Sequence, residues 1–170
     1  MPVDGAFSAR GRAVVLVTGM SGTGKSTVLR ELGRRGHRVL DTDDPGWIIQ
    51  LDTLGVPEPG WDLDRLTAVV ERHQVGWLFI AGCVANQAVL YDRFDAVVLL
   101  SAPGEVLLSR VTSRANPFGS TSSDRSKITE DQAVFEPSLR AGASHELVTT
   151  TPVVDVVLAL ERIAATGKRQ

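Results

Sequence analysis

The segment that most constrains the fold is Gly19-Met20-Ser21-Gly22-Thr23-Gly24-Lys25-Ser26-Thr27. It matches the pattern G-x-x-x-x-G-K-[ST] in full, directly after the apolar run 13–18 and before an amphipathic stretch. A strand, a glycine-rich turn and a helix in this order surround an anion with backbone N–H groups and the positive end of a helix. The sequence therefore predicts a phosphate-binding loop, with a strand-to-helix turn that binds no ligand as the alternative.

Each residue type in this loop has an expected task. Lys25 reaches the β- and γ-phosphates of a nucleotide, the Ser26 hydroxyl binds Mg²⁺, and the Thr27 hydroxyl lies near the α-phosphate. We expect the nucleotide to be held by Gly19, Ser21, Gly22, Thr23, Gly24, Lys25, Ser26 and Thr27.

Strands and helices are expected to alternate along the rest of the chain. Apolar runs predict strands at 13–18, 37–41, 76–81, 95–100 and 145–149. Helical spacing of apolar residues predicts helices at 26–35, 62–73, 104–114 and 152–164. Continuous apolar runs separated by amphipathic helices are typical of a parallel sheet covered on both faces.

Two aspartates stand at the end of the second predicted strand, in Asp41-Thr42-Asp43-Asp44. Alternate residues of an extended segment point to the same side, and strand ends meet the phosphate loop at one edge of a parallel sheet. Two carboxylates there suit two tasks, which are support of hydrated Mg²⁺ and orientation of an acceptor near the γ-phosphate. The alternative is a solvated turn, which we favour for Asp44 as a helix cap.

The phosphate loop followed by Asp41-Thr42-Asp43 resembles shikimate kinase and, more broadly, the small P-loop kinases such as adenylate kinase, other nucleoside monophosphate kinases and gluconate kinase. The resemblance covers about residues 13–164. It implies that Asp41 supports Mg²⁺ and that Asp43 contacts the acceptor hydroxyl.

The exit of the third predicted strand departs from these families. Shikimate kinase has three glycines here, of which only Gly82 remains, and the arginine motif of adenylate kinase is absent. Gln87 lies near the position of the glutamine that reads the acceptor base in adenylate kinase. We expect Gly82 and Gln87 to contact the acceptor, and a helix-surface position is the alternative for Gln87.

An insert at about 44–76 is where related kinases hold their acceptor. It contains Trp47 and Trp61 among prolines and glycines. An aromatic face stacks well on a nucleobase, so we expect Trp47 to border the acceptor. The alternative is that both tryptophans only pack the insert against the main domain.

A second insert, at about 114–127, combines Gly, Pro, Ser and Thr with flanking cations and is expected to form a mobile lid. We expect Arg114 to stabilise the transferring phosphoryl group, Arg110 to bind the nucleotide, by stacking on adenine or at its phosphates, and Arg140 to contact the acceptor. The alternative is that these arginines lie on exposed, charged helix faces.

Composition limits the class of partner. The 170 residues include 18 Lys plus Arg and 20 Asp plus Glu, so the net charge is −2. Such a chain binds nucleic acid or anionic membranes poorly. The single cysteine, Cys83, excludes an internal disulfide framework, and no apolar run approaches the about 20 residues of a membrane span. We expect a cytoplasmic monomer.

These features predict one domain over 1–170 with the three-layer α/β/α P-loop fold and a five-stranded parallel sheet in the order 2-3-1-4-5. The expected activity is phosphoryl transfer from ATP, with Mg²⁺, to a small acceptor, foremost a nucleoside monophosphate. A small hydroxylated metabolite of shikimate or gluconate type is the second acceptor class. A nucleotide-binding regulator or slow ATPase is the alternative from another class.

Overall fold

A parallel sheet of five strands lies at the centre of the protein, whose computed structural model describes residues 11–113 and 121–166. The strands are β1 (Ala13–Thr18), β2 (Arg38–Asp41), β5 (Trp77–Ala81), β6 (Ala96–Ser101) and β7 (His145–Val148). Their order across the sheet is β2-β5-β1-β6-β7. Counted along the chain, this is the predicted order 2-3-1-4-5, so the fold prediction is confirmed.

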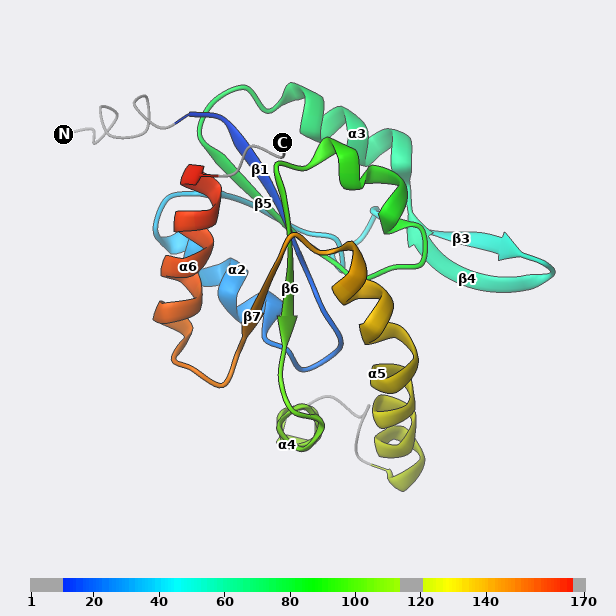
Figure 1. Cartoon of the computed structure of the whole chain (residues 1–170). Helices are drawn as coiled ribbons and strands as arrows, with labels where there is room; N and C mark the ends of the chain where they lie inside the picture. Colours follow the sequence, from blue (N-terminus) through cyan, green and yellow to red (C-terminus); the bar gives the residue numbers. More distant parts are fainter. Residues whose placement is uncertain (1–10, 114–120, 167–170) are drawn as a thin grey trace.

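Helices cover both faces of this sheet (Figure 1). They are α2 (Lys25–Arg34), α3 (Leu63–Arg72), the 3-10 helix η1 (Gln87–Arg93), α4 (Gly104–Ser113), α5 (Ser122–Gly142) and α6 (Val153–Thr166). One core cluster joins α2 and α6 to one face, and a second joins α3 and η1 to the other. The three-layer arrangement follows from β1 and β6, which are buried at every residue and so need cover on both sides.

The predicted helices are present, and their ends follow local signals. Asp62 caps α3, since its carboxylate accepts a hydrogen bond of 3.1 Å from the Arg65 N–H. Leu32 of α2 and Leu160 of α6 are fully buried, and each contributes roughly 1.5–3 kcal/mol through burial. None of the described helices combines the length and apolar character needed to cross a bilayer.

The first insert forms an antiparallel hairpin, β3 (Ile48–Thr53) and β4 (Val56–Trp61), for which no strands were predicted from the sequence. Its two-residue turn has φ of 55° at Leu54 and 81° at Gly55, as a tight hairpin turn requires. The Asp62 N–H donates to the Trp47 carbonyl, so these two residues are a hydrogen-bonded pair of the hairpin. From this pair on, hydrogen-bonded and non-hydrogen-bonded residue pairs alternate along the two strands. Pro57 and Pro59 then fall where β4 needs no N–H donor, because their nitrogens face the outer edge.

Helix α5 was not predicted from the sequence. Its 21 residues include Pro137, and its buried side chains are few, so the apolar pattern is weak. Thr121 caps it by accepting a hydrogen bond of 3.1 Å from the Asp124 N–H. Residues 122–127 of the expected lid form its first turns, whereas residues 114–120 lie outside the described part of the chain.

Candidate functional site

The phosphate loop connects β1 to α2 and curls around the amine of Lys25. The amine donates to the carbonyl oxygens of Gly19, at 2.5 Å, and Met20, at 3.1 Å. Gly19 has φ of 152°, and a Cβ there would lie 2.4 Å from the Leu100 carbonyl oxygen. Only glycine fits this turn, which brings the loop close to the end of β6.

The start of α2 is joined to the end of β2 by one side-chain pair. The Ser26 hydroxyl donates to Oδ2 of Asp41 at 2.9 Å, and Oδ1 of Asp41 accepts from the Asp43 N–H at 3.0 Å. A hydroxyl and a carboxylate in contact form a hard oxygen pair, which suits Mg²⁺. No group of three or more metal-binding side chains occurs within residues 11–113 and 121–166. The pair therefore fits a Mg²⁺ ion whose other ligands are nucleotide phosphates and water.

Asp43 is within electrostatic reach of both Asp41 and Lys25. Desolvation raises the pKa of the Asp43 carboxyl above 3.8, the negative charge of Asp41 raises this pKa further, and the positive charge of Lys25 opposes the shift. The fold thus gathers Lys25, Ser26, Asp41 and Asp43 at the carboxyl edge of the sheet.

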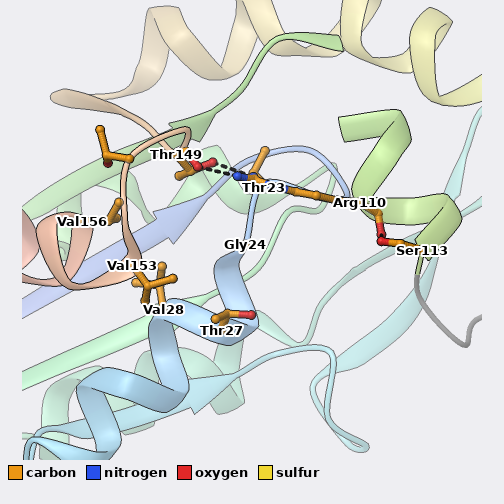
Figure 2. Close-up of a pocket in the computed structure, with 10 residues that line it drawn as sticks. Thr23, Gly24, Thr27, Val28, Arg110, Ser113, Thr149, Val153 and Val156 are labelled. Carbon is orange, nitrogen blue, oxygen red and sulfur yellow. Dashed lines mark hydrogen bonds between the residues drawn. The ribbon is translucent and has the colours of Figure 1, made fainter. Parts of the chain in front are cut away.

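A cavity of about 290 Å³ opens beside the phosphate loop. Figure 2 shows its lining, which comes from the loop and α2, from α4, and from the segment around the start of α6: Thr23, Gly24, Thr27, Val28, Arg110, Ser113, Thr149, Thr151, Val153 and Val156. Three valines give the wall an apolar part, and threonine, serine and arginine side chains supply hydrogen-bonding groups. Apolar surface combined with placed polar groups is typical of a small-molecule site.

Arg110 bridges two sides of this cavity. Its guanidinium donates to the carbonyl oxygen of Gly22 at 3.1 Å and to the Thr149 hydroxyl at 2.9 Å, and it also donates to the Thr149 carbonyl (Figure 2). Arg110 therefore lines the cavity beside the phosphate loop, at which we expected it to contact the nucleotide. Its hydrogen bonds connect the phosphate loop to the segment after β7.

The space beside Gly82, expected to admit the acceptor, is filled by the protein. Trp61 is fully buried, and its indole N–H donates to the Thr42 hydroxyl at 3.0 Å. A Cβ on Gly82 would lie 2.1 Å from the Thr42 Oγ1 and 3.0 Å from the indole of Trp61. Gly82 thus allows Trp61 to pack closely, and this packing replaces the expected approach of an acceptor.

The two tryptophans of the first insert have different environments. Trp61 belongs to the core, whereas Trp47 is half-buried at the base of the hairpin. The Arg65 guanidinium lies over the ring of Trp47, 4.2 Å from its centre. Trp47 also borders a hollow of about 330 Å³ that includes Ser26, Asp41 and Asp44.

Two residues expected to contact the acceptor, Gln87 and Arg140, form hydrogen bonds with other protein groups. Gln87 is 2% exposed and its amide is fully hydrogen-bonded, to Thr18, Val84 and Tyr91. Buried contacts thus replace the expected acceptor contact of Gln87.

Arg140 donates to Glu136 at 2.8 Å and to Glu146 at 2.9 Å. The hydrogen bonds that Arg140 donates to Glu146 and then to Glu136 raise the pKa of Arg140. These ion pairs hold the guanidinium against α5 and β7, away from the acceptor role expected for it. Arg114, expected to act on the phosphoryl group, lies outside the described residues.

Sequence reasoning missed three residues of this site. Thr149 lies directly after β7, and a small polar residue at the carboxyl end of a parallel strand was a usable signal. Thr42 stands between two aspartates that the sequence did single out. Asn86 had no local signal, because its partner Trp61 is 25 positions away.

This geometry, with its strand order, defines a small P-loop domain with a kinase-like fold. Over residues 15–130 the chain matches the AAA domain family, and it belongs to that family. Shikimate kinase from Acinetobacter baumannii, solved with shikimate, has a TM-score of 0.62 at 20% identity, over 97% of this chain and 98% of that one. A gluconokinase from Sinorhizobium meliloti has a TM-score of 0.52 at 22% identity, over 91% and 95%. At these identities the likeness shows the fold alone.

Curated relatives are named only as nucleotide-binding proteins. One from Mycolicibacterium smegmatis is 28% identical over 158 residues, which are 91% of this chain and 54% of that protein. One from Gluconobacter oxydans is 28% identical over 143 residues, 78% of this chain and 40% of that protein. The chain spans about half the length of the curated relatives it matches.

Proposed function

We propose that this protein transfers the γ-phosphoryl group of ATP, with Mg²⁺, to a small acceptor, foremost a nucleoside monophosphate. The observation that carries the proposal is the convergence of Lys25, Ser26, Asp41 and Asp43 at one edge of the sheet. A phosphate loop alone needs only the first two of these residues. The added pair of carboxylates supplies groups for a metal ion and an acceptor.

Each of these residues has a separate role in the proposed transfer. The acceptor oxygen forms a bond to the γ-phosphorus while the bond from that phosphorus to the bridging oxygen breaks, and the electron pair leaves with ADP. Lys25 stabilises negative charge on the phosphoryl oxygens, and Ser26 with Asp41 would hold Mg²⁺, which neutralises charge on the phosphates. Asp43 orients the acceptor and takes the proton of a hydroxyl acceptor, a role that its raised pKa favours.

The nucleotide base is assigned to the cavity lined by Arg110, Thr149 and Thr151. The acceptor is assigned to the side of Asp43 and Trp47, since the half-buried indole offers an aromatic surface to a flat ring. Because Trp61 closes the space beside Gly82, we rank a nucleoside monophosphate above a cyclic polyol pressed against that strand.

A coupled assay for ADP release, run with nucleoside monophosphates, shikimate and gluconate, tests the proposal. Release of ADP that requires one of these acceptors, together with a phosphorylated product detected by mass spectrometry, is the expected result. Asp43→Asn should abolish the acceptor-dependent release of ADP, while Glu130→Gln, on the exposed surface of α5, serves as the control.

A nucleotide-binding regulator that phosphorylates no acceptor is the second candidate. It is favoured by the names of the curated relatives and by the filled space beside Gly82. Tight ATP binding with the same slow hydrolysis for every acceptor would support the regulator and contradict the kinase.

A further inference from the structure

Two adjacent amide side chains, Asn86 and Gln87, lie at the start of η1 and contact different halves of the proposed site. Asn86 immediately precedes η1, and Gln87 is its first residue. Neither amide reaches a phosphate-binding or metal-binding atom directly. Each acts on a neighbour of those atoms.

Gln87 holds the base of the phosphate loop. Its Nε2 donates to the Thr18 hydroxyl at 3.0 Å and to the Tyr91 hydroxyl at 2.8 Å, and its Oε1 accepts from the Val84 N–H at 3.0 Å. Thr18 is the last residue of β1 and directly precedes Gly19, whose carbonyl accepts from Lys25. Since Thr18 and Gln87 are both buried, this contact has no competition from water.

Asn86 holds the turn that carries the aspartates, through Trp61. Its Oδ1 accepts from the Trp61 N–H at 2.8 Å and its Nδ2 donates to the Trp61 carbonyl at 3.0 Å. The indole N–H of Trp61 then donates to Thr42, whose hydroxyl donates to the Ala81 carbonyl at 2.8 Å. Thr42 is the residue between Asp41 and Asp43, so its position sets where both carboxylates lie.

We propose that Asn86 and Gln87 are paired positioning residues, which fix the positions of the Asp41–Asp43 turn and the phosphate loop relative to each other. The inference rests on the proposed function, because this relative position matters only if the turn and the loop act on one Mg²⁺–nucleotide complex. Residues that orient the ligands of a metal affect metal affinity about 10–100-fold without touching the ion. The two amides should therefore have separable effects on nucleotide and metal.

Binding of AMP-PNP, a non-hydrolysable ATP analogue, separates these effects when it is measured by calorimetry in EDTA and over a Mg²⁺ titration. Gln87→Met should weaken AMP-PNP binding about tenfold in both conditions, the loss expected for one buried hydrogen bond. Asn86→Leu should leave affinity in EDTA within about twofold and raise the half-saturating Mg²⁺ concentration about tenfold. Tyr91→Phe, which keeps the bond from Gln87 to Thr18, and Thr53→Val, in the hairpin, are the matched controls and should behave like wild type.

Circular dichroism establishes that each variant is folded. Where a variant does not fold, the uncharged replacements Asn86→Ala and Gln87→Ala take its place, since each removes the same hydrogen bonds with a smaller side chain. Folded variants that bind like wild type, or that lose nucleotide and Mg²⁺ affinity in the same proportion, would overturn the pairing and leave the proposed function standing. Absence of AMP-PNP binding to the wild-type protein would overturn both.

Discussion

The Ser26 hydroxyl donates a 2.9 Å hydrogen bond to the carboxylate of Asp41, 15 positions further along the chain. This contact joins the first turn of α2 to the last residue of β2, although β5 separates β2 from β1 in the sheet. It brings the proposed metal-binding hydroxyl and the first of the two aspartates together.

Replacement of Lys25 by alanine should lower phosphoryl transfer by about 100-fold or more, because the amine is assigned to charge that develops on the phosphoryl group. Steady-state rates with the acceptor found in the panel give the measurement. The melting temperature should stay within a few degrees, since the amine lies in the phosphate loop and not in the core. Arg30→Ala, on the next turn of the same helix, is the control, and near-normal rates in a folded Lys25→Ala protein would contradict the kinase proposal.

Asp43→Asn should raise thermal stability at pH 7 while abolishing transfer. The folded protein raises the pKa of this carboxyl above 3.8, so the folded state favours its protonated form. The wild-type protein accordingly loses stability as pH rises through that raised pKa, and the variant does not. Melting temperatures of both proteins from pH 3 to pH 8 should diverge with increasing pH. A constant difference across this range would contradict the assignment, and Glu130→Gln, on the exposed surface of α5, is the control.

Glu161→Gln should destabilise the protein by about 1–3 kcal/mol at neutral pH, because Glu161 ties α6 to the end of α2. Its carboxylate accepts from Arg35 at 2.8 Å and contacts His37 Nε2 at 2.7 Å. The hydrogen bond from Arg35 lowers the pKa of Glu161 below 4.5. Its contribution is therefore present above pH 4.5 and is lost as pH falls through the lowered pKa.

Urea unfolding at pH 7 and pH 3 provides the measurement for Glu161. The destabilisation caused by Glu161→Gln should shrink at the lower pH. Glu71→Gln breaks the exposed pair between Glu71 and Arg93 and should change stability by less than about 1 kcal/mol. If the two substitutions had equal effects, the partly buried position of Glu161 would not be the cause.

Gly82→Ala should destabilise the fold by about 1–3 kcal/mol and shift the fluorescence of Trp61, because the added methyl group collides with Thr42 and the indole. Chemical denaturation monitored by tryptophan emission gives both quantities at once. Gly11→Ala, where a Cβ meets nothing within 4 Å, is the matched control. An unchanged stability of Gly82→Ala would show that the space beside Gly82 is open and available to an acceptor.

The amino-acid sequence by itself determined the phosphate loop, the five parallel strands and their order, and four of the helices. These features depend on local signals: the glycine spacing from Gly19 to Gly24, runs of apolar residues in β1 and β6, and helical spacing with a cap at Asp62. The pair Asp41 and Asp43 was also found from sequence, because the carboxyl ends of parallel strands meet at one edge. Backbone geometry and side-chain period suffice for the loop, the strands, the helices and the aspartate pair, whereas the strand order is what the resemblance to the small P-loop kinases implied.

Only the tertiary structure decided which of the polar and aromatic residues are exposed to a ligand. Trp47 and Trp61 share one insert and one composition, yet Trp61 is buried on Gly82 and Trp47 remains half-exposed, because the register of the β3–β4 hairpin brings them to different surroundings. Gln87 became internal because Thr18 of β1, 69 positions away in the sequence, accepts a hydrogen bond from its amide. Partner choice over such sequence distances depends on which segments pack together, and no local pattern encodes it.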